Sequence, residues 1–278
     1  MLTISQSQTH QRNDDLLNKL DLTMSRRPNE HFLESGPIIY EFDEGTKCEN
    51  CKDECPGYKS HEWRKTCQAC KCPRTDHAIY HEQMTSVCER IGFKSDALLN
   101  NVSSGTIDPK QMGYIWVPPG LLTSTKIQQY FNQLPSEKVP KLNSSGEKYR
   151  NKMLLYQLPK QDLALAYCKY VDKEHNGSFE DFIAARNEIA LDIGYVKDAP
   201  QKASCNRCTK SMQQSELAVF APKLRDNMTF HPNCFTCTTC DELLVDLTYC
   251  VYEDKIYCER HYSEILKPRC SSCDECLT

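Results

Sequence analysis

Apolar residues in the middle of the chain recur every three or four positions, the spacing that gives a helix one apolar face. One such stripe runs from Ile127 to Leu134 and follows Ser124, whose side chain can cap the first turn of a helix. We expect these stripes to pack as a hydrophobic core and not to line a cofactor pocket. Further helices are predicted over residues 147–157, 163–171 and 179–193.

Two other stretches have patterns that a helix does not explain. The residues from Tyr249 to Tyr257 predict a β-hairpin that turns at Glu253 and Asp254. Before the helical region, the adjacent residues Pro118 and Pro119 exclude a helix and favour an extended run.

Polar, turn-forming stretches divide the chain into units. The expected order is a disordered tail, a cysteine-rich region, a linker, a helical domain, a second cysteine-rich module and a short final piece. Their predicted bounds are residues 1–46, 47–90, 91–112, 113–198, 203–265 and 268–278.

The second cysteine-rich module has eight Cys and His residues at spacings typical of zinc ligands. The pairs Cys205-x2-Cys208 and His231-x2-Cys234 predict one tetrahedral site. All four positions at each metal would be taken by protein, which indicates structural zinc, no catalytic residue and no enzymatic activity. The second predicted site contains Cys237, Cys240, Cys258 and His261.

The first cysteine-rich region also offers eight candidate ligands. Cys48-x2-Cys51 and Cys67-x2-Cys70 are separated by 15 residues and would suffice for one zinc site. Four more candidates interleave with these pairs, so two further zinc ions are predicted. Both sequential and crossed pairings are geometrically open, and for the two histidines a solvent-exposed side chain is the alternative. The interleaved candidates are Cys55, His61, Cys72 and His77.

Composition supports zinc over disulfides as the use of the 18 cysteines. The first ten residues are polar and lack the apolar core of a signal peptide. No stretch approaches the roughly 18 apolar residues of a membrane span. We therefore expect a reducing, cytoplasmic compartment, in which zinc is the usual partner of clustered cysteines.

Charge bears on the class of partner. The whole chain of 278 residues has a formal net charge of −4, and acidic residues outnumber basic ones in the second cysteine-rich module. DNA-binding fingers need a strongly basic face. Nucleic acid is therefore not expected as the partner, and a zinc-finger transcriptional regulator is the alternative interpretation.

The ligand spacing of the second module resembles that of the LIM domain, a tandem two-zinc module for protein binding. Phe235, between the two inner ligand pairs, matches the bulky residue that packs between the zinc lobes in that family. Cys270-x2-Cys273 resembles the start of a second LIM domain, which is expected to be truncated at Thr278. No partner ligands are evident for Cys270, Cys273 and Cys276.

The middle of the chain resembles the PET domain. The matching strings include Trp116-Val-Pro-Pro-Gly120, Gly146-Glu-Lys-Tyr-Arg150 and Leu154-Leu-Tyr-Gln-Leu-Pro159. A PET domain directly before a LIM domain is the arrangement of the testin and prickle family. The cysteine-rich start, with Cys55-Pro-Gly-Tyr58, favours a testin-like member over a prickle-like one.

This resemblance implies a non-enzymatic adaptor or scaffold for protein–protein interactions. Its implied partners are cytoskeletal, adhesion or polarity proteins, with an intramolecular PET–LIM contact as a further option. Cell junctions or adhesions are the implied location within the cytoplasm. The expected fold class is multidomain, with small zinc-stabilised modules, β-hairpin-rich in the LIM domain, flanking a mainly α-helical PET domain.

Overall fold

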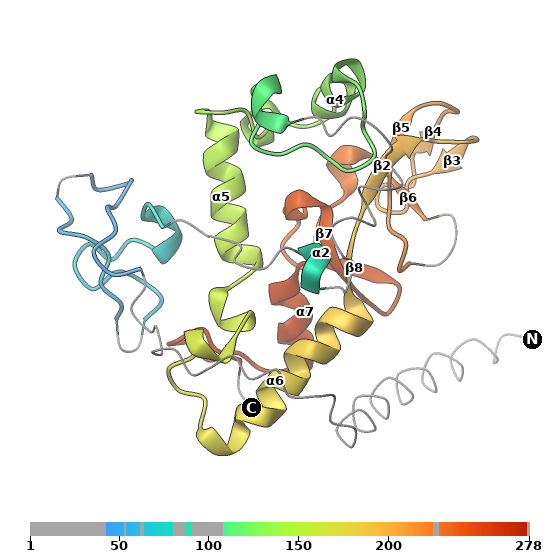
Figure 1. Ribbon diagram of the computed structural model, residues 1–278. Helices are drawn as coiled ribbons and strands as arrows, with labels where there is room; N and C mark the ends of the chain where they lie inside the picture. Colours follow the sequence, from blue (N-terminus) through green and yellow to red (C-terminus); the bar gives the residue numbers. More distant parts are fainter. Residues whose placement is uncertain are drawn as a thin grey trace, which may run out of the picture.

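A computed structural model describes residues 43–52, 54–61, 64–79, 87–90, 108–224 and 228–276. We refer to residues 43–79 as the cysteine-rich segment, residues 108–198 as the middle segment and residues 203–276 as the C-terminal segment. Figure 1 shows helix α5 standing between the cysteine-rich segment, in blue, and the C-terminal segment, in orange and red. Among the described residues, no helix combines the length and apolar character that a membrane crossing requires.

The cysteine-rich segment consists mainly of turns. Among its described residues, the one regular element is the short 3₁₀ helix η1 (Arg74–Asp76). Isolated bridges pair Cys48 with His77 and Thr66 with Pro73. The buried cluster is made chiefly of cysteines, and Leu155 of the middle segment packs against it. So small a segment cannot bury enough apolar surface to be stable alone.

The expected tail and linker fall largely outside the described residues, since residues 1–42 and 91–107 are not described. The last expected tail residues belong to the cysteine-rich segment instead. Asp43 is buried and accepts hydrogen bonds from Arg74, and the Gly45 N–H donates to the Tyr58 carbonyl at 2.8 Å.

Three α-helices lie in the middle segment: α4 (Ser124–Phe131), α5 (Ser145–Gln157) and α6 (Asn176–Ala185). Thr123, one residue before the expected cap, accepts a hydrogen bond from the Lys126 N–H and starts α4. Ser144 caps α5 in the same way. The short 3₁₀ turns are η2 (Pro109–Met112), η3 (Ser136–Lys138), η4 (Lys160–Asp162), η5 (Leu165–Tyr167) and η6 (Lys173–His175).

The expectation of a mainly α-helical PET domain is not confirmed. Residues 163–171 form only the turn η5, because the Lys169 and Tyr170 N–H groups donate to the Glu275 carboxylate and not to helix carbonyls. After α6 the chain makes a π-helical turn, η7 (Arg186–Ala190), and then two strands, β1 (Leu191–Ile193) and β2 (Tyr195–Asp198). The helix predicted over residues 179–193 therefore ends early.

Strands of the middle segment complete sheets of the C-terminal segment. Strand β1 pairs antiparallel with β7 (Thr248–Tyr252), and β7 pairs with β8 (Lys255–Tyr257). Strand β2 pairs antiparallel with β5 (Leu217–Phe220), which continues to β6 (Thr229–Phe230). A separate two-stranded sheet joins β3 (Ala203–Ser204) and β4 (Ser211–Met212).

The predicted hairpin in the C-terminal segment is confirmed. Strands β7 and β8 are joined by Glu253 and Asp254, both with positive φ, as a tight hairpin turn requires. Helix α7 (Glu259–Leu266) follows β8 directly. The 3₁₀ turns η8 (Pro232–Cys234) and η9 (Val245–Leu247) connect the remaining strands.

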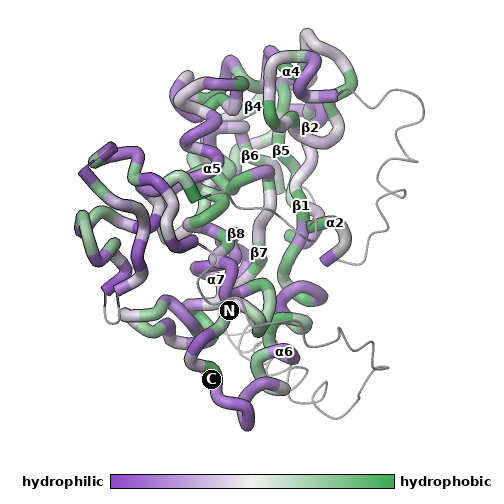
Figure 2. Tube along the Cα trace, turned by 60° about the vertical axis from the view of Figure 1, so that its left-hand side comes forward, coloured by the Kyte–Doolittle hydropathy of each residue, from purple (hydrophilic) through white to green (hydrophobic). Residues whose placement is uncertain are grey.

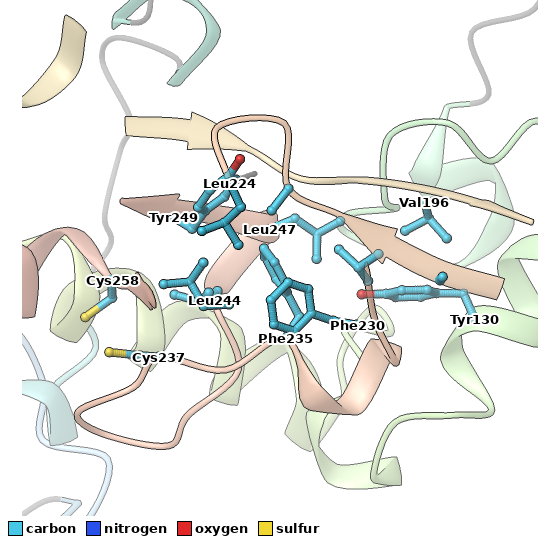
Figure 3. Close-up of a cluster of buried hydrophobic side chains, with 14 of the residues drawn as sticks. Tyr130, Val196, Leu224, Phe230, Phe235, Cys237, Leu244, Leu247, Tyr249 and Cys258 are labelled. Atoms are coloured by element: carbon cyan, nitrogen blue, oxygen red, sulfur yellow. The ribbon is translucent and has the colours of Figure 1, made fainter. Parts of the chain in front are cut away.

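One hydrophobic core runs through the middle and C-terminal segments. Ile127 and Tyr130 of α4 belong to the same buried cluster as Phe235, Leu247 and Tyr249. Phe235 is 1% exposed and its ring meets those of Phe230 and Tyr249 edge-on (Figure 3). Strand β5, strongly hydrophobic along its length, runs through the interior (Figure 2). The two segments therefore share their core.

Two glycines in the PET-like strings lie where a side chain would not fit. A Cβ on Gly146, in the first turn of α5, would lie 1.7 Å from the Val139 carbonyl oxygen. Gly120 has a φ of +93°, and a Cβ there would lie 2.4 Å from the Val196 carbonyl oxygen. Both residues let the backbone of one element approach another closely.

Buried ion pairs tie α7 to the rest of the molecule. Glu259, 3% exposed, accepts two hydrogen bonds from Arg90 of the short helix α2 (Val87–Arg90) at 2.6 and 2.8 Å. The fully buried Arg186 also approaches Glu259, at 3.1 Å. Arg269 forms a similar buried pair with Asp162, with contacts of 2.7 and 3.0 Å.

We predict that Glu259→Gln destabilises the fold by about 3–5 kcal/mol, because it leaves two arginines without a counter-charge in a buried site. The free energy of unfolding from urea titration measures this effect. Asp198→Asn is the matched control, since it removes an exposed ion pair with Lys126 and should cost at most about 1 kcal/mol. Equal effects of the two substitutions would contradict the role given to burial.

Candidate metal centres

The same backbone turn follows five of the Cys-x2-Cys pairs, those that begin at Cys48, Cys67, Cys205, Cys237 and Cys270. The residue after the pair has a left-handed φ at all five places, between 53° and 67°. In four of them its N–H donates to the carbonyl of the first cysteine, at 2.9 to 3.2 Å. Non-glycine residues seldom adopt this conformation. Each of these turns places both sulfur atoms of its pair on the same side of the backbone. The five residues are Lys52, Lys71, Thr209, Asp241 and Asp274.

The structure gathers the first four predicted ligands of the C-terminal segment. The ligand atoms of Cys205, Cys208, His231 and Cys234 all lie within 4.8 Å of one another. Cys208 Sγ is 3.4 Å from His231 Nδ1. With zinc–sulfur bonds of about 2.3 Å, neighbouring ligands of a tetrahedron lie roughly 3.5–3.8 Å apart. The set fits a zinc ion.

The second set combines a turn, a strand end and a helix. Cys237, Cys240, Cys258 and His261 also lie within 4.8 Å of one another. His261, on α7, places Nδ1 at 3.6 Å from Cys237 Sγ and 3.1 Å from Cys258 Sγ. Figure 3 shows the Cys237 and Cys258 sulfur atoms facing the same space beside the hydrophobic core. The ring's other nitrogen, Nε2, is 3.7 Å from the Glu264 carboxylate, which can orient it.

The cysteine-rich segment forms two further sets. One contains Cys48, Cys51, Cys70 and Cys72, and the other contains Cys55, Cys67, Cys70 and His77. The pairing is therefore crossed, and Cys70 belongs to both sets. His61 lies in neither set, although the spacing made it a candidate ligand.

His77 is oriented for ligation by its own backbone neighbour. Its Nδ1 lies 3.1 Å from the Pro73 carbonyl oxygen, which can only accept a hydrogen bond. Nδ1 therefore carries the proton and Nε2 is left with its lone pair. Nε2 points at the sulfur atoms, 3.6 Å from Cys70 Sγ and 3.9 Å from Cys55 Sγ. A carbonyl in this position is a usual outer partner of a metal-binding histidine.

Other cysteines have different surroundings. Cys168 and Cys250 are buried away from the four sets, and burial raises the pKa of both thiols. Buried protonated cysteines act as small apolar side chains. Cys270 and Cys273 form the fifth turn, and Cys276 packs near Asp162. These three cysteines join no described ligand set, and the side chain of Cys88 is outside the described part of the structure.

The four sets have the donor chemistry of zinc sites. Sulfur and imidazole nitrogen in groups of four, half-buried or buried, are the ligands of structural zinc. When bound, zinc cross-links each set and stabilises the turns around it. That each individual residue binds zinc remains a prediction.

Family models match two parts of the chain. The model described as PET Domain matches residues 96–197, and the model described as LIM domain matches residues 205–265. No solved structure matches the chain.

Curated relatives of the chain include prickle proteins. Prickle planar cell polarity protein 3 of Homo sapiens is 41% identical over 240 residues, which cover 84% of this chain and 38% of that protein. Prickle planar cell polarity protein 3-B of Xenopus laevis is 36% identical over 242 residues, 84% of this chain and 44% of its own length. Prickle-like protein 1 of Mus musculus is 48% identical over 167 residues, 59% of this chain and 20% of its own. The chain thus spans less than half the length of these relatives.

The alignment with the human protein extends into the cysteine-rich segment. Residues 96–278 make up only about two thirds of the chain, so a match over 84% of it includes many earlier residues. The cysteine-rich start therefore does not by itself separate a testin-like chain from a prickle-like one, and that preference stays a prediction. With a PET domain followed directly by a LIM domain and with prickle proteins among its relatives, this chain belongs to the PET–LIM family.

Proposed function

We propose that this chain is a non-enzymatic, zinc-binding adaptor that joins proteins of the cell-polarity machinery, the actin cytoskeleton or cell adhesions. The observation that carries the proposal is the pairing of a LIM domain with a PET domain in a chain similar to planar cell polarity proteins. Each ligand set contains four protein residues, which leaves no open coordination position for a substrate. Its location would be the cytoplasm, at junctions or adhesions.

The PET and LIM domains would act as one binding unit. Glu242 of the LIM domain accepts hydrogen bonds from Lys138 and Tyr149, both at 2.8 Å. Burial tends to raise the pKa of Glu242, but these two hydrogen bonds outweigh it and lower the pKa. Arg150 holds Asp246 with two hydrogen bonds, one of them at 2.7 Å. These contacts fix α5 against the LIM domain.

Gln157 supplies a buried polar contact between the two domains. It is 2% exposed, its amide N–H donates to the Leu243 carbonyl at 2.8 Å, and its amide oxygen accepts from the Val245 N–H at 3.1 Å. One glutamine thus satisfies two backbone groups in a segment without regular pairing.

The sheets limit which surfaces a partner can use. PET strands β1 and β2 occupy one edge of the sheets β1-β7-β8 and β2-β5-β6. On the opposite side of the first sheet, the Thr238 N–H donates to the Ile256 carbonyl of β8 at 2.9 Å. A partner would therefore bind helices and turns more readily than these strand edges. Exposed apolar side chains available for this are Leu122, Leu142, Tyr170 and Ile265.

Affinity capture with the intact, zinc-loaded chain under reducing conditions tests the proposed function. We expect polarity, cytoskeletal or adhesion proteins to be recovered, and recovery to be unchanged by Arg64→Glu. The alternative, a zinc-finger transcriptional regulator, predicts DNA binding that weakens steeply with salt and is lost in Arg64→Glu. Capture of DNA with no cytoskeletal, adhesion or polarity protein would overturn the adaptor assignment.

We predict that Gln157→Ala lowers the free energy of unfolding by about 1–3 kcal/mol, because it leaves the Leu243 carbonyl and the Val245 N–H without partners. Urea unfolding monitored by circular dichroism measures the change. Gln128→Ala is the control, since Gln128 lies on the exposed side of α4 and its loss should change stability by less than about 0.5 kcal/mol. A wild-type midpoint for Gln157→Ala would show that the PET–LIM contact contributes little.

A further inference from the structure

The two ligand sets of the cysteine-rich segment contain seven residues for eight coordination positions. Cys70 is the residue counted twice. Cys48, Cys51 and Cys72 belong to one set only, and Cys55, Cys67 and His77 belong to the other. The LIM domain differs, because its two sets share no residue.

The distances around Cys70 are those of a ligand in both sets. Its sulfur lies 3.9 Å from Cys48 Sγ in the first set and 3.6 Å from His77 Nε2 in the second. Both separations equal the edge of a zinc tetrahedron, roughly 3.5–3.8 Å for zinc–sulfur bonds of about 2.3 Å, within a few tenths of an ångström. The Cys70 sulfur also lies within 4.8 Å of Cys72 Sγ in the first set, and of Cys55 Sγ and Cys67 Sγ in the second.

Among these seven ligands, only the cysteines can serve two metals through one atom. A thiolate sulfur has several lone pairs, whereas an imidazole nitrogen has one. His61, the eighth candidate by spacing, is in neither set and so does not complete a second independent site.

We propose that the cysteine-rich segment binds a dinuclear zinc cluster in which the Cys70 thiolate bridges the two ions. Each ion has three terminal protein ligands and shares the fourth. Six thiolates and one neutral histidine around two Zn²⁺ give a cluster charge of −2. Donors to the terminal sulfurs offset part of this charge. The Asn50 amide donates to Cys72 Sγ at 3.4 Å, and the Cys51 N–H donates to Cys48 Sγ at 3.3 Å.

Because they share one ligand, the binding of the two ions would be coupled. Cys70 lies on the turn that ends at Lys71, and the second set continues through η1 to His77. Asp76 of η1 is held by Lys152 of α5 at 3.1 Å, and Leu155 packs against the sulfur-rich core. Loss of the shared ligand should therefore release both ions and loosen the contact with α5.

Cadmium-113 NMR of the intact chain tests the bridge directly. With ¹¹³Cd in place of zinc, two ions that share one sulfur show a two-bond ¹¹³Cd–¹¹³Cd coupling, while ions in separate sites do not. We expect one cross-peak between two cadmium resonances, and its loss in Cys70→Ser. Two N-terminal resonances without coupling, or one N-terminal cadmium ion only, would overturn the proposal.

Zinc counting gives an independent outcome that does not depend on cadmium. We expect native mass spectrometry in the presence of a competing chelator to find two zinc ions fewer per chain in Cys70→Ser than in the wild type. Cys51→Ser, which removes a terminal ligand of one set, should lose one ion. Loss of one ion from each variant would show that Cys70 belongs to a single site. We expect both variants to retain the LIM zinc ions. Their retention would show that the remainder of the chain is folded.

Discussion

The cysteine-rich turns depend on zinc–thiolate bonds, because the cysteine-rich segment has little apolar core of its own and the LIM domain completes its core only with residues of the PET domain. In the cysteine-rich segment the buried cluster is made largely of the ligands themselves. A structural zinc site contributes on the order of 10 kcal/mol at neutral pH in small peptides, which is comparable to the whole stability of a small domain. The left-handed turn that follows five of the Cys-x2-Cys pairs holds the backbone in the form that ligation of both sulfur atoms requires. The stability of these turns therefore depends first on metal binding.

Helix α5 connects the cysteine-rich segment with the LIM domain. Lys148, Lys152 and Leu155, four and three positions apart, face the cysteine-rich segment. The neighbouring stripe, which includes Tyr149 and Gln157, faces the LIM domain. Helical periodicity places these two stripes on different sides, so one helix contacts both zinc-dependent parts. Together with strands β1 and β2, it makes the PET domain a part of the LIM core and not a separate module.

The parts that the sequence predicted are those with a local cause. Ligand spacing predicted the two LIM sets, the alternating pattern predicted the β7–β8 hairpin, and apolar stripes predicted α4 and α5. The failures have non-local causes. Leu191–Ile193 read as the end of a helix because their partner, β7, lies more than fifty residues away in the chain. Residues 163–171 do not form the predicted helix, because two of their N–H groups donate to the Glu275 carboxylate. No local pattern in the sequence identifies this contact. Ligation by His61 stays a prediction from spacing, since the two described sets of the cysteine-rich segment contain Cys70 twice and do not contain His61.

Hydrogen exchange of the PET helices before and after zinc removal from the LIM domain tests the central claim most directly. The measurement compares the wild-type chain with Cys237→Ser, which removes one LIM ligand, and follows the amides of α4 and α5. Because the PET and LIM domains share a core and two sheets, we expect these amides to lose protection together with those of β5 and β7. Full protection of α4 and α5 beside an unfolded LIM domain would show two independent domains and would contradict this account.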